Sequence, residues 1–179
     1  ELEDILAVAA AENVIPVAAV ERIITAIAEQ EIIVGTAADD QFGVRSITEA
    51  RKAELFREYS INRPFVMYTG GIDLRKNIEA LIESYSRLSR GERQKYQLAI
   101  VCSVQPAERD RLESLARSLG VHDLVMTGFV PEDDLIDLYN LCELFVFPSW
   151  HEGFGLPALE AMWCDAPVIG SNRSSLPEV

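Results

Sequence analysis

The sequence is constrained most by an alternation of short apolar segments with segments of helical periodicity, which begins at residue 65. The apolar segments are rich in β-branched and aromatic residues and lie at residues 65–69, 97–102, 124–128, 144–148 and 166–170. They are apolar along their whole length, as is typical of strands that are covered on both faces. Strands that alternate with helices predict an α/β fold with a doubly wound, Rossmann-like parallel sheet.

Between these segments, apolar residues recur every three to four positions, which indicates amphipathic helices. The spacing predicts helices over residues 76–90, 107–119, 132–142 and 156–164. Residues 36–64 are predicted to be a connection that contains one more helix, around residues 48–59.

The beginning of the chain has a different character. Residues 1–30 are rich in Ala, Val and Ile and predict two packing helices that are broken near Pro16. We interpret them as a helical lead-in with no assigned role. A further strand is expected at residues 31–35, so that residues 31–179 make up the Rossmann-like domain.

The charge of the chain excludes several classes of partner. It has 16 Lys and Arg residues against 29 Asp and Glu residues, a net charge of −13. This balance is unfavourable for binding a nucleic acid backbone or an anionic membrane. No apolar run approaches the roughly 20 residues that span a bilayer, and no signal-peptide pattern is visible. We therefore expect no nucleic acid partner, no direct membrane binding and a cytoplasmic location.

A metal or disulfide framework is not expected either. The three cysteines lie in or beside apolar segments, no CxxC motif occurs, and the two histidines have no metal-ligand spacing to them. Asp133 and Asp134 are adjacent acids, but acidic residues in the first turn of a helix are explained by the helix dipole. The sequence thus predicts neither a metal nor a cofactor.

Doubly wound sheets bind ligands beyond the carboxyl ends of their strands, so the loops that follow the strands are the candidate sites. In the first such loop, Gly70 and Gly71 allow the backbone to approach a ligand closely. Arg75 and Lys76 then add positive charge where a helix begins, which favours a phosphate. The alternative is a glycine-rich turn followed by a solvated basic pair.

A second loop follows the apolar segment that ends at residue 148. Gly153 and Gly155 again allow close approach, and Pro157 stands where a helix begins. Glu152 is predicted in the loop and Glu160 about two helical turns into the helix. Carboxylates accept hydrogen bonds from sugar and ribose hydroxyls. The alternatives are a helix cap for Glu152 and a solvated surface position for Glu160.

Two other loops and one histidine are weaker candidates. The backbone near Val130 could face a planar base, and the hydroxyl-rich residues 170–178 could meet phosphate or form a turn. His151 lies beside a carboxylate, as a general base would. Because no nucleophile or third orienting group accompanies it, we interpret His151 as a structural residue or a ligand contact.

Three blocks of sequence resemble the donor-binding half of the family 4 glycosyltransferases. They are GGIDLRKNIEAL, TGFVPEDDLIDLYNLCELFVFPSWHEGFGLPALEAM and PVIGSNRSSLPEV. That family is retaining and has a GT-B fold of two Rossmann-like halves. The resemblance is strong over residues 65–179, weaker over 31–64 and poor over 1–30. Glu152 and Glu160, with seven residues between them, match the E-x7-E signature of the family.

The resemblance assigns roles to the candidate residues. It implies that Lys76 binds the donor diphosphate, that Glu160 holds the ribose hydroxyls and that Glu152 lies near the donor sugar, with Lys76 and Glu152 as the catalytic candidates. The other implied substrate contacts are Gly70, Gly71, Arg75, Val130 beside the nucleobase, Gly153, Phe154, Gly155 and Leu156. Many members carry an arginine at the position of Gly71, so diphosphate charge would rest here on Lys76, backbone amides and Arg75.

The resemblance also implies a function: the donor-binding domain of a retaining glycosyltransferase that needs no metal. The GG…RKN and SNRSSLPEV blocks favour bacterial mannosyltransferases of surface polysaccharide synthesis, hence GDP-mannose, with UDP- and dTDP-sugars open. A glycan or lipid-linked acceptor would be bound by an amino-terminal half that this sequence lacks, which could also bring the protein to the inner face of the membrane. The isolated chain is then expected to transfer little or nothing. The alternatives are a non-catalytic interaction module and, less favoured, a GT-B epimerase or phosphorylase.

Overall fold

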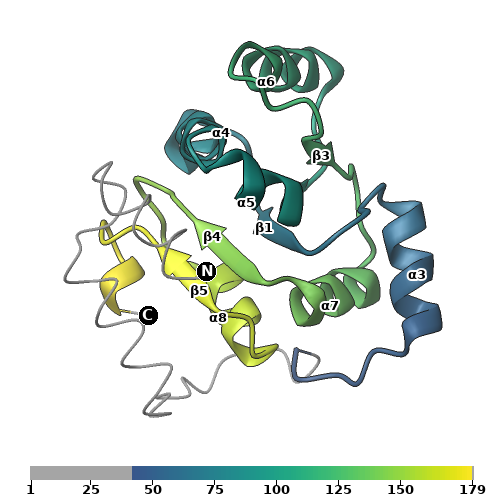
Figure 1. Ribbon diagram of the computed structural model, residues 1–179. Helices are drawn as coiled ribbons and strands as arrows, with labels where there is room; N and C mark the ends of the chain where they lie inside the picture. The colour runs from purple at the N-terminus through teal and green to yellow at the C-terminus, as the bar shows by residue number, and fades with distance from the viewer. Residues whose placement is uncertain (1–41, 179) are drawn as a thin grey trace.

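The computed structural model describes residues 42–178, so the expectations for residues 1–30 and for a strand at residues 31–35 lie outside it. The described part contains one parallel sheet of five strands in the order β3-β2-β1-β4-β5 (Figure 1). The strands are β1 (Phe65–Thr69), β2 (Gln97–Val101), β3 (Val125–Met126), β4 (Leu144–Phe147) and β5 (Val168–Gly170). The predicted α/β fold with a parallel sheet is confirmed.

All strands except the last residue of β1 and of β5 are buried, as their apolar composition predicts. The two outermost strands are shorter than expected. β3 ends because the chain turns at Gly128, whose φ is +83°. β5 begins only after Pro167, which has no N–H to donate to the neighbouring strand.

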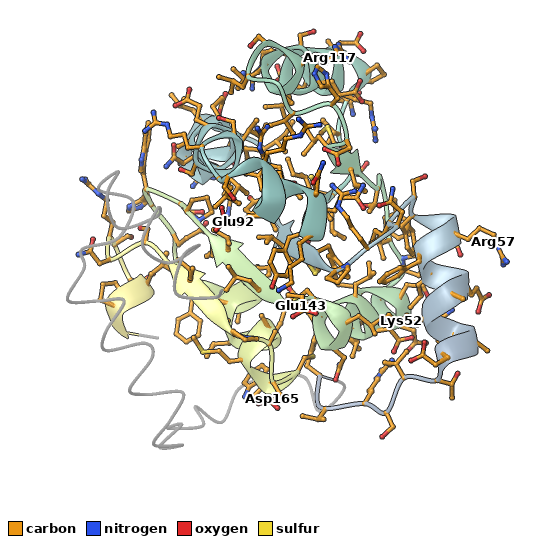
Figure 2. The ribbon with its side chains drawn as sticks, in the orientation of Figure 1. Lys52, Arg57, Glu92, Arg117, Glu143 and Asp165 are labelled. Atoms are coloured by element: carbon orange, nitrogen blue, oxygen red, sulfur yellow. The ribbon has the colours of Figure 1, made fainter. Side chains whose placement is uncertain are left out.

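The helices cover both faces of the sheet. They are α3 (Glu49–Glu58), α4 (Ile78–Ser86), α5 (Arg90–Lys95), α6 (Pro106–Ser118), α7 (Glu132–Leu141) and α8 (Leu156–Trp163), with 3-10 turns η1 (Leu74–Lys76) and η2 (Leu176–Glu178). Figure 1 shows α4 and α6 on one side of the sheet and α7 and α8 on the other. Charged side chains extend from the outer faces of the helices, as Arg57 and Arg117 do in Figure 2.

One predicted helix is divided. The periodicity over residues 76–90 predicts a single helix, but α4 begins only after Asn77, which has the left-handed φ of 57°. The end of the predicted range belongs to the start of α5, a short helix with a capping box formed by Ser89 and Glu92. The stripe of apolar residues continues past the end of α4 because Leu88 also packs into the core.

The acidic start of α7 is held by arginines from the segment before β1. Asp133 and Asp134 pair with Arg45 and Arg51 respectively, and Asp137 one turn later accepts from both arginines at 3.1 and 2.9 Å. These carboxylates therefore have protein cations as partners, in addition to the helix dipole. No group of side chains suited to a metal ion occurs within residues 42–178. Nor does any helix in that range combine the length and apolarity needed to cross a bilayer.

The strand order determines where a ligand can lie. From β1 the chain proceeds outward to β2 and β3, returns through α7, and then adds β4 on the other side of β1. The loops that leave β1 and β4 therefore begin at adjacent strands but lead to opposite faces of the sheet. This is the topological switch point, the usual ligand position in sheets of this class.

Candidate functional site

The loop after β1 depends on a glycine. Gly70 has a φ of +136°, and a Cβ at this position would lie only 2.9 Å from Tyr68 Oη. The Tyr68 hydroxyl instead donates to the carbonyl oxygen of Gly71 at 2.5 Å. Burial raises the pKa of Tyr68, so the hydroxyl keeps the proton that this bond requires. A buried tyrosine thus holds the backbone of the loop.

The loop after β1 is also bonded to the loop after β4. The Asn77 side chain, which is buried, donates to the carbonyl oxygen of Pro148 at 3.2 Å. The backbone N–H of Trp150 donates to the carbonyl oxygen of Arg75 at 2.7 Å. These two hydrogen bonds connect segments more than seventy residues apart in the sequence. They place the end of η1 beside the residues that follow β4.

Lys76 and Glu152 form an ion pair at this junction. Lys76 Nζ lies 2.6 Å from Oε1 and 2.9 Å from Oε2 of Glu152. The two side chains are only 14 % and 10 % exposed, so each charge has largely lost its hydration. Lys76 Nζ also lies 5.5 Å from the centre of the Phe147 ring, within cation–π range. The structure therefore brings together the two residues proposed as catalytic.

The hydroxyl-rich loop after β5 supports Glu152 from a third side. Ser174 Oγ and Ser175 Oγ donate to the Glu152 carbonyl oxygen at 2.8 and 3.1 Å. Ser174 Oγ also lies 3.1 Å from Nδ1 of His151. Three residues earlier, Ser171 donates to the Ser149 carbonyl oxygen at 2.6 Å. These hydroxyls thus hold the backbone around Glu152.

Glu160 lies closer to the start of α8 than expected. The helix begins at Leu156, after Gly155 with a φ of +94°, so Glu160 is about one turn into it rather than two. Glu160 is half-buried, and its Oε2 accepts a hydrogen bond from Tyr139 of α7 at 2.9 Å. Burial raises the pKa of Glu160, although the bond from Tyr139 acts in the opposite direction. This contact is incompatible with a freely solvated surface glutamate.

The other basic residue of the first loop has a separate partner. Arg75 is exposed, and its guanidinium pairs with Asp73, with Nε 2.9 Å from Oδ1. Hydrogen bonds from Arg75 lower the pKa of Asp73. At Gly71, an added Cβ would come no closer than 3.4 Å to another residue, so a methyl group fits there. Arg75 and Lys76 are therefore adjacent in sequence but have different carboxylates as partners.

The remaining candidates border the site or lie on another loop. Phe154 and Leu156 are 57 % and 50 % exposed, and Trp150 is 51 % exposed, so these apolar side chains near Glu152 in the sequence are open to solvent. Gly153 has open space where a side chain would begin. Val130 is half-buried against the core in the loop before α7, which is a different loop from those that carry the ion pair.

Two residues that sequence reasoning did not select are Asn77 and Tyr139. Asn77 is the last residue of the RKN sequence. It adopts a left-handed backbone conformation between η1 and α4, for which the sequence has no distinct signal. Tyr139 falls on the apolar stripe of a helix, where periodicity indicates only a core position. Its hydroxyl is the one feature that could have suggested a polar partner.

The sequence of this chain was compared with protein families and with known proteins. The sequence model described as "Glycosyl transferases group 1" matches residues 51–179. Among curated relatives, a serotype-specific mannosyltransferase WbdA of Escherichia coli is 47 % identical over 148 residues, which are 82 % of this chain and 18 % of the relative. An O-antigen chain mannosyltransferase B of Escherichia coli is 42 % identical over 117 residues, 64 % of this chain and 30 % of the relative.

A solved structure shares the fold. Anabaena HepE, in complex with UDP and glucose, superposes with a TM-score of 0.62 at 21 % identity, over 74 % of this chain and 36 % of that protein. The chain spans less than a fifth of the length of WbdA, the first of its curated relatives above. Since the family's sequence model covers most of its length, this chain belongs to the glycosyl transferases group 1 family.

Proposed function

We propose that this chain is the nucleotide-sugar-binding domain of a retaining family 4 glycosyltransferase that transfers a hexose. The observation that carries the proposal is the Lys76–Glu152 ion pair at the switch point of the sheet. It supplies one desolvated cation and one carboxylate at the position where sheets of this class bind nucleotides.

The arrangement suits a diphosphate bound beside a sugar. A diphosphate can replace the Glu152 carboxylate at Lys76 Nζ, because both are anions and Lys76 has no other carboxylate partner among the described residues. The start of α8 adds the positive end of a helix dipole. Lys76 then stabilises the leaving diphosphate as its charge increases in the transition state.

Glu152 acquires a different role in this proposal. When Lys76 turns to the diphosphate, the Glu152 carboxylate is free to accept hydrogen bonds from the hydroxyls of the donor sugar. In a retaining transfer, the acceptor hydroxyl attacks from the face of the sugar that the diphosphate leaves. The acceptor, a glycan or lipid-linked saccharide, would bind to a domain outside this chain, and the isolated chain would transfer little or nothing.

The proposed donor is GDP-mannose, and the proposed pathway is surface polysaccharide synthesis. Both relatives described above carry the name of mannosyltransferases, and one is named for the O-antigen chain. HepE binds UDP in its crystals, so UDP-sugars are the main alternative donors. No metal is part of the proposal.

A thermal-shift screen of GDP-mannose, UDP-glucose and dTDP-glucose tests the donor. A ligand that binds only the folded chain raises its Tm, and we expect GDP-mannose to give the largest increase. Lys76→Ala should abolish that increase. Lys52→Ala is the matched control, because Lys52 Nζ also lies 5.5 Å over a phenylalanine ring but on α3. If the folded wild-type chain shows no response at millimolar concentrations of these donors, a non-catalytic interaction module is the better reading.

A further inference from the structure

The carboxylate of Glu160 has a single hydrogen-bonding partner among the described residues. Tyr139 Oη donates to Oε2 of Glu160 at 2.9 Å, and Oε1 receives no hydrogen bond within residues 42–178. The two residues come from different helices, α7 and α8, which lie on the same side of the sheet (Figure 1). One oxygen of the carboxylate is thus committed to the protein, and the other is available to a ligand.

The position of the Tyr139 hydroxyl is determined without Glu160. The ring is fully buried and is held edge-on by Phe42, with centroids 6.1 Å apart, and by Phe145, with centroids 5.4 Å apart. Contacts of this geometry restrict a ring in both tilt and depth. Glu160 is only half-buried and has a flexible side chain, so the tyrosine orients the carboxylate and not the reverse.

The proton of this hydrogen bond is also fixed. Burial, together with the negative charge of Glu160, raises the pKa of Tyr139 well above its ordinary value, so the phenol remains a donor. Glu160 must therefore be the acceptor, and the bond favours its charged form. A charged acceptor makes stronger hydrogen bonds with hydroxyl groups than a neutral one.

We propose that Tyr139 is a positioning residue, whose hydroxyl fixes the Glu160 carboxylate so that its second oxygen accepts from the ribose hydroxyls of the donor. The inference rests on the proposed function, because it concerns the site assigned there to the nucleotide sugar. Tyr139 itself makes no contact with the donor in this proposal. Its effect on affinity is transmitted through Glu160 alone.

The decisive experiment pairs a variant of the protein with a variant of the ligand. Binding of GDP and of UDP to the 179-residue chain is measured by calorimetry, each beside its 2′,3′-dideoxy analogue. Tyr139→Phe keeps both ring contacts and removes only the hydroxyl. We expect it to weaken binding of the ribose nucleotide about tenfold, roughly the effect of one hydrogen bond, and to leave the dideoxy analogue unchanged.

Two further variants control the result. Tyr85→Phe removes another buried tyrosine hydroxyl, which donates to the Tyr96 carbonyl oxygen at 2.7 Å, and it should change neither affinity. Phe42→Leu removes one support of the Tyr139 ring while it keeps the hydroxyl. It should cause a smaller loss of affinity that is again confined to the ribose nucleotides. This variant still tests the proposal if Tyr139→Phe does not fold.

The pH dependence of binding gives a second readout. The titratable groups that act on Glu160 are Tyr139 and Glu132 on α7, and Glu160 itself acts on Cys164, which follows α8. Binding of the ribose nucleotide should weaken as pH falls through the pKa of Glu160, which burial has raised. In Tyr139→Phe this weakening should begin at a higher pH, because the hydrogen bond that lowered the pKa is gone.

The outcomes separate the two proposals. Equal losses for ribose and dideoxy nucleotides in Tyr139→Phe, or no loss for either, would overturn the positioning role and leave the proposed function intact. If the wild-type chain binds both nucleotide forms equally, the ribose contact through Glu160 is wrong. If the wild-type chain binds none of the nucleotides, the proposed function fails and this inference fails with it.

Discussion

At the scale of single residues, the site depends on charges and backbone shapes that have few substitutes. Lys76 and Glu152 neutralise each other where solvent hardly reaches. Sequence reasoning selected both residues, each for its expected ligand, but did not predict that they would bind one another. That contact depends on the distance between two loops, which local sequence does not encode. The same limit applies to the contact between Tyr139 and Glu160, which joins two helices.

Removal of one partner of the ion pair should be costly. Lys76→Met or Glu152→Gln alone leaves a desolvated charge without its counterion, and each should lower the free energy of unfolding by about 3 kcal/mol. The double variant should lose clearly less than the sum of the two. Urea denaturation of the four proteins measures this coupling. Strict additivity would show that the two charges do not stabilise each other.

Substitution by alanine should destabilise the chain at Gly70 but have little effect on its stability at the adjacent Gly71. Gly70→Ala forces a Cβ to within 2.9 Å of Tyr68 Oη at a φ of +136°, and it should cost about 1–3 kcal/mol of stability. Gly71→Ala meets no contact closer than 3.4 Å and should stay within about 0.5 kcal/mol of the wild type. Thermal unfolding of the two variants distinguishes them. A destabilised Gly71→Ala would mean that the loop needs both glycines.

At the scale of elements, the apolar strands and amphipathic helices were predictable because burial on both faces leaves a continuous apolar signal. The 10-residue helix α3 was also predicted, and Thr48 caps it as its side chain suggests. Short α5 was missed because it has no buried residue and hence no apolar stripe. The clasp between α3 and α7, formed by Arg51 with Asp134 and Asp137, was missed because acids at a helix start already have a local explanation.

The clasp should make stability depend on pH below the ordinary range of aspartate. Burial tends to raise the pKa of Asp134, but hydrogen bonds from Tyr59 and Arg51 outweigh it and lower the pKa below its usual 3.8. The stabilisation is therefore present at neutral pH and is lost as pH falls through the lowered pKa. Asp134→Asn should be less stable than the wild type at pH 7, and the difference should begin to shrink below about pH 4 and disappear only below the lowered pKa. A difference that did not shrink between about pH 4 and pH 2 would assign the loss to packing.

At the scale of the whole molecule, the net charge of −13 and the anionic ligand proposed above act in opposite directions. The fold resolves this conflict locally, because the switch point gathers Lys76 and the start of α8 in one place, whatever charge the rest of the surface carries. The strand order that creates the switch point could be expected only as a class, since the alternation of strand and helix does not specify which strands are neighbours.

The hydrogen bonds between Arg75 and Trp150 and between Asn77 and Pro148 have a consequence for how the chain folds. They close a loop of more than seventy residues that contains β2, β3, β4 and four complete helices. Such distant contacts form late, because the entropy of loop closure must be overcome first. The proposed binding site therefore forms only when the central sheet is complete. Because partly folded forms of the chain lack this site, a bound nucleotide would stabilise the complete fold relative to all of them.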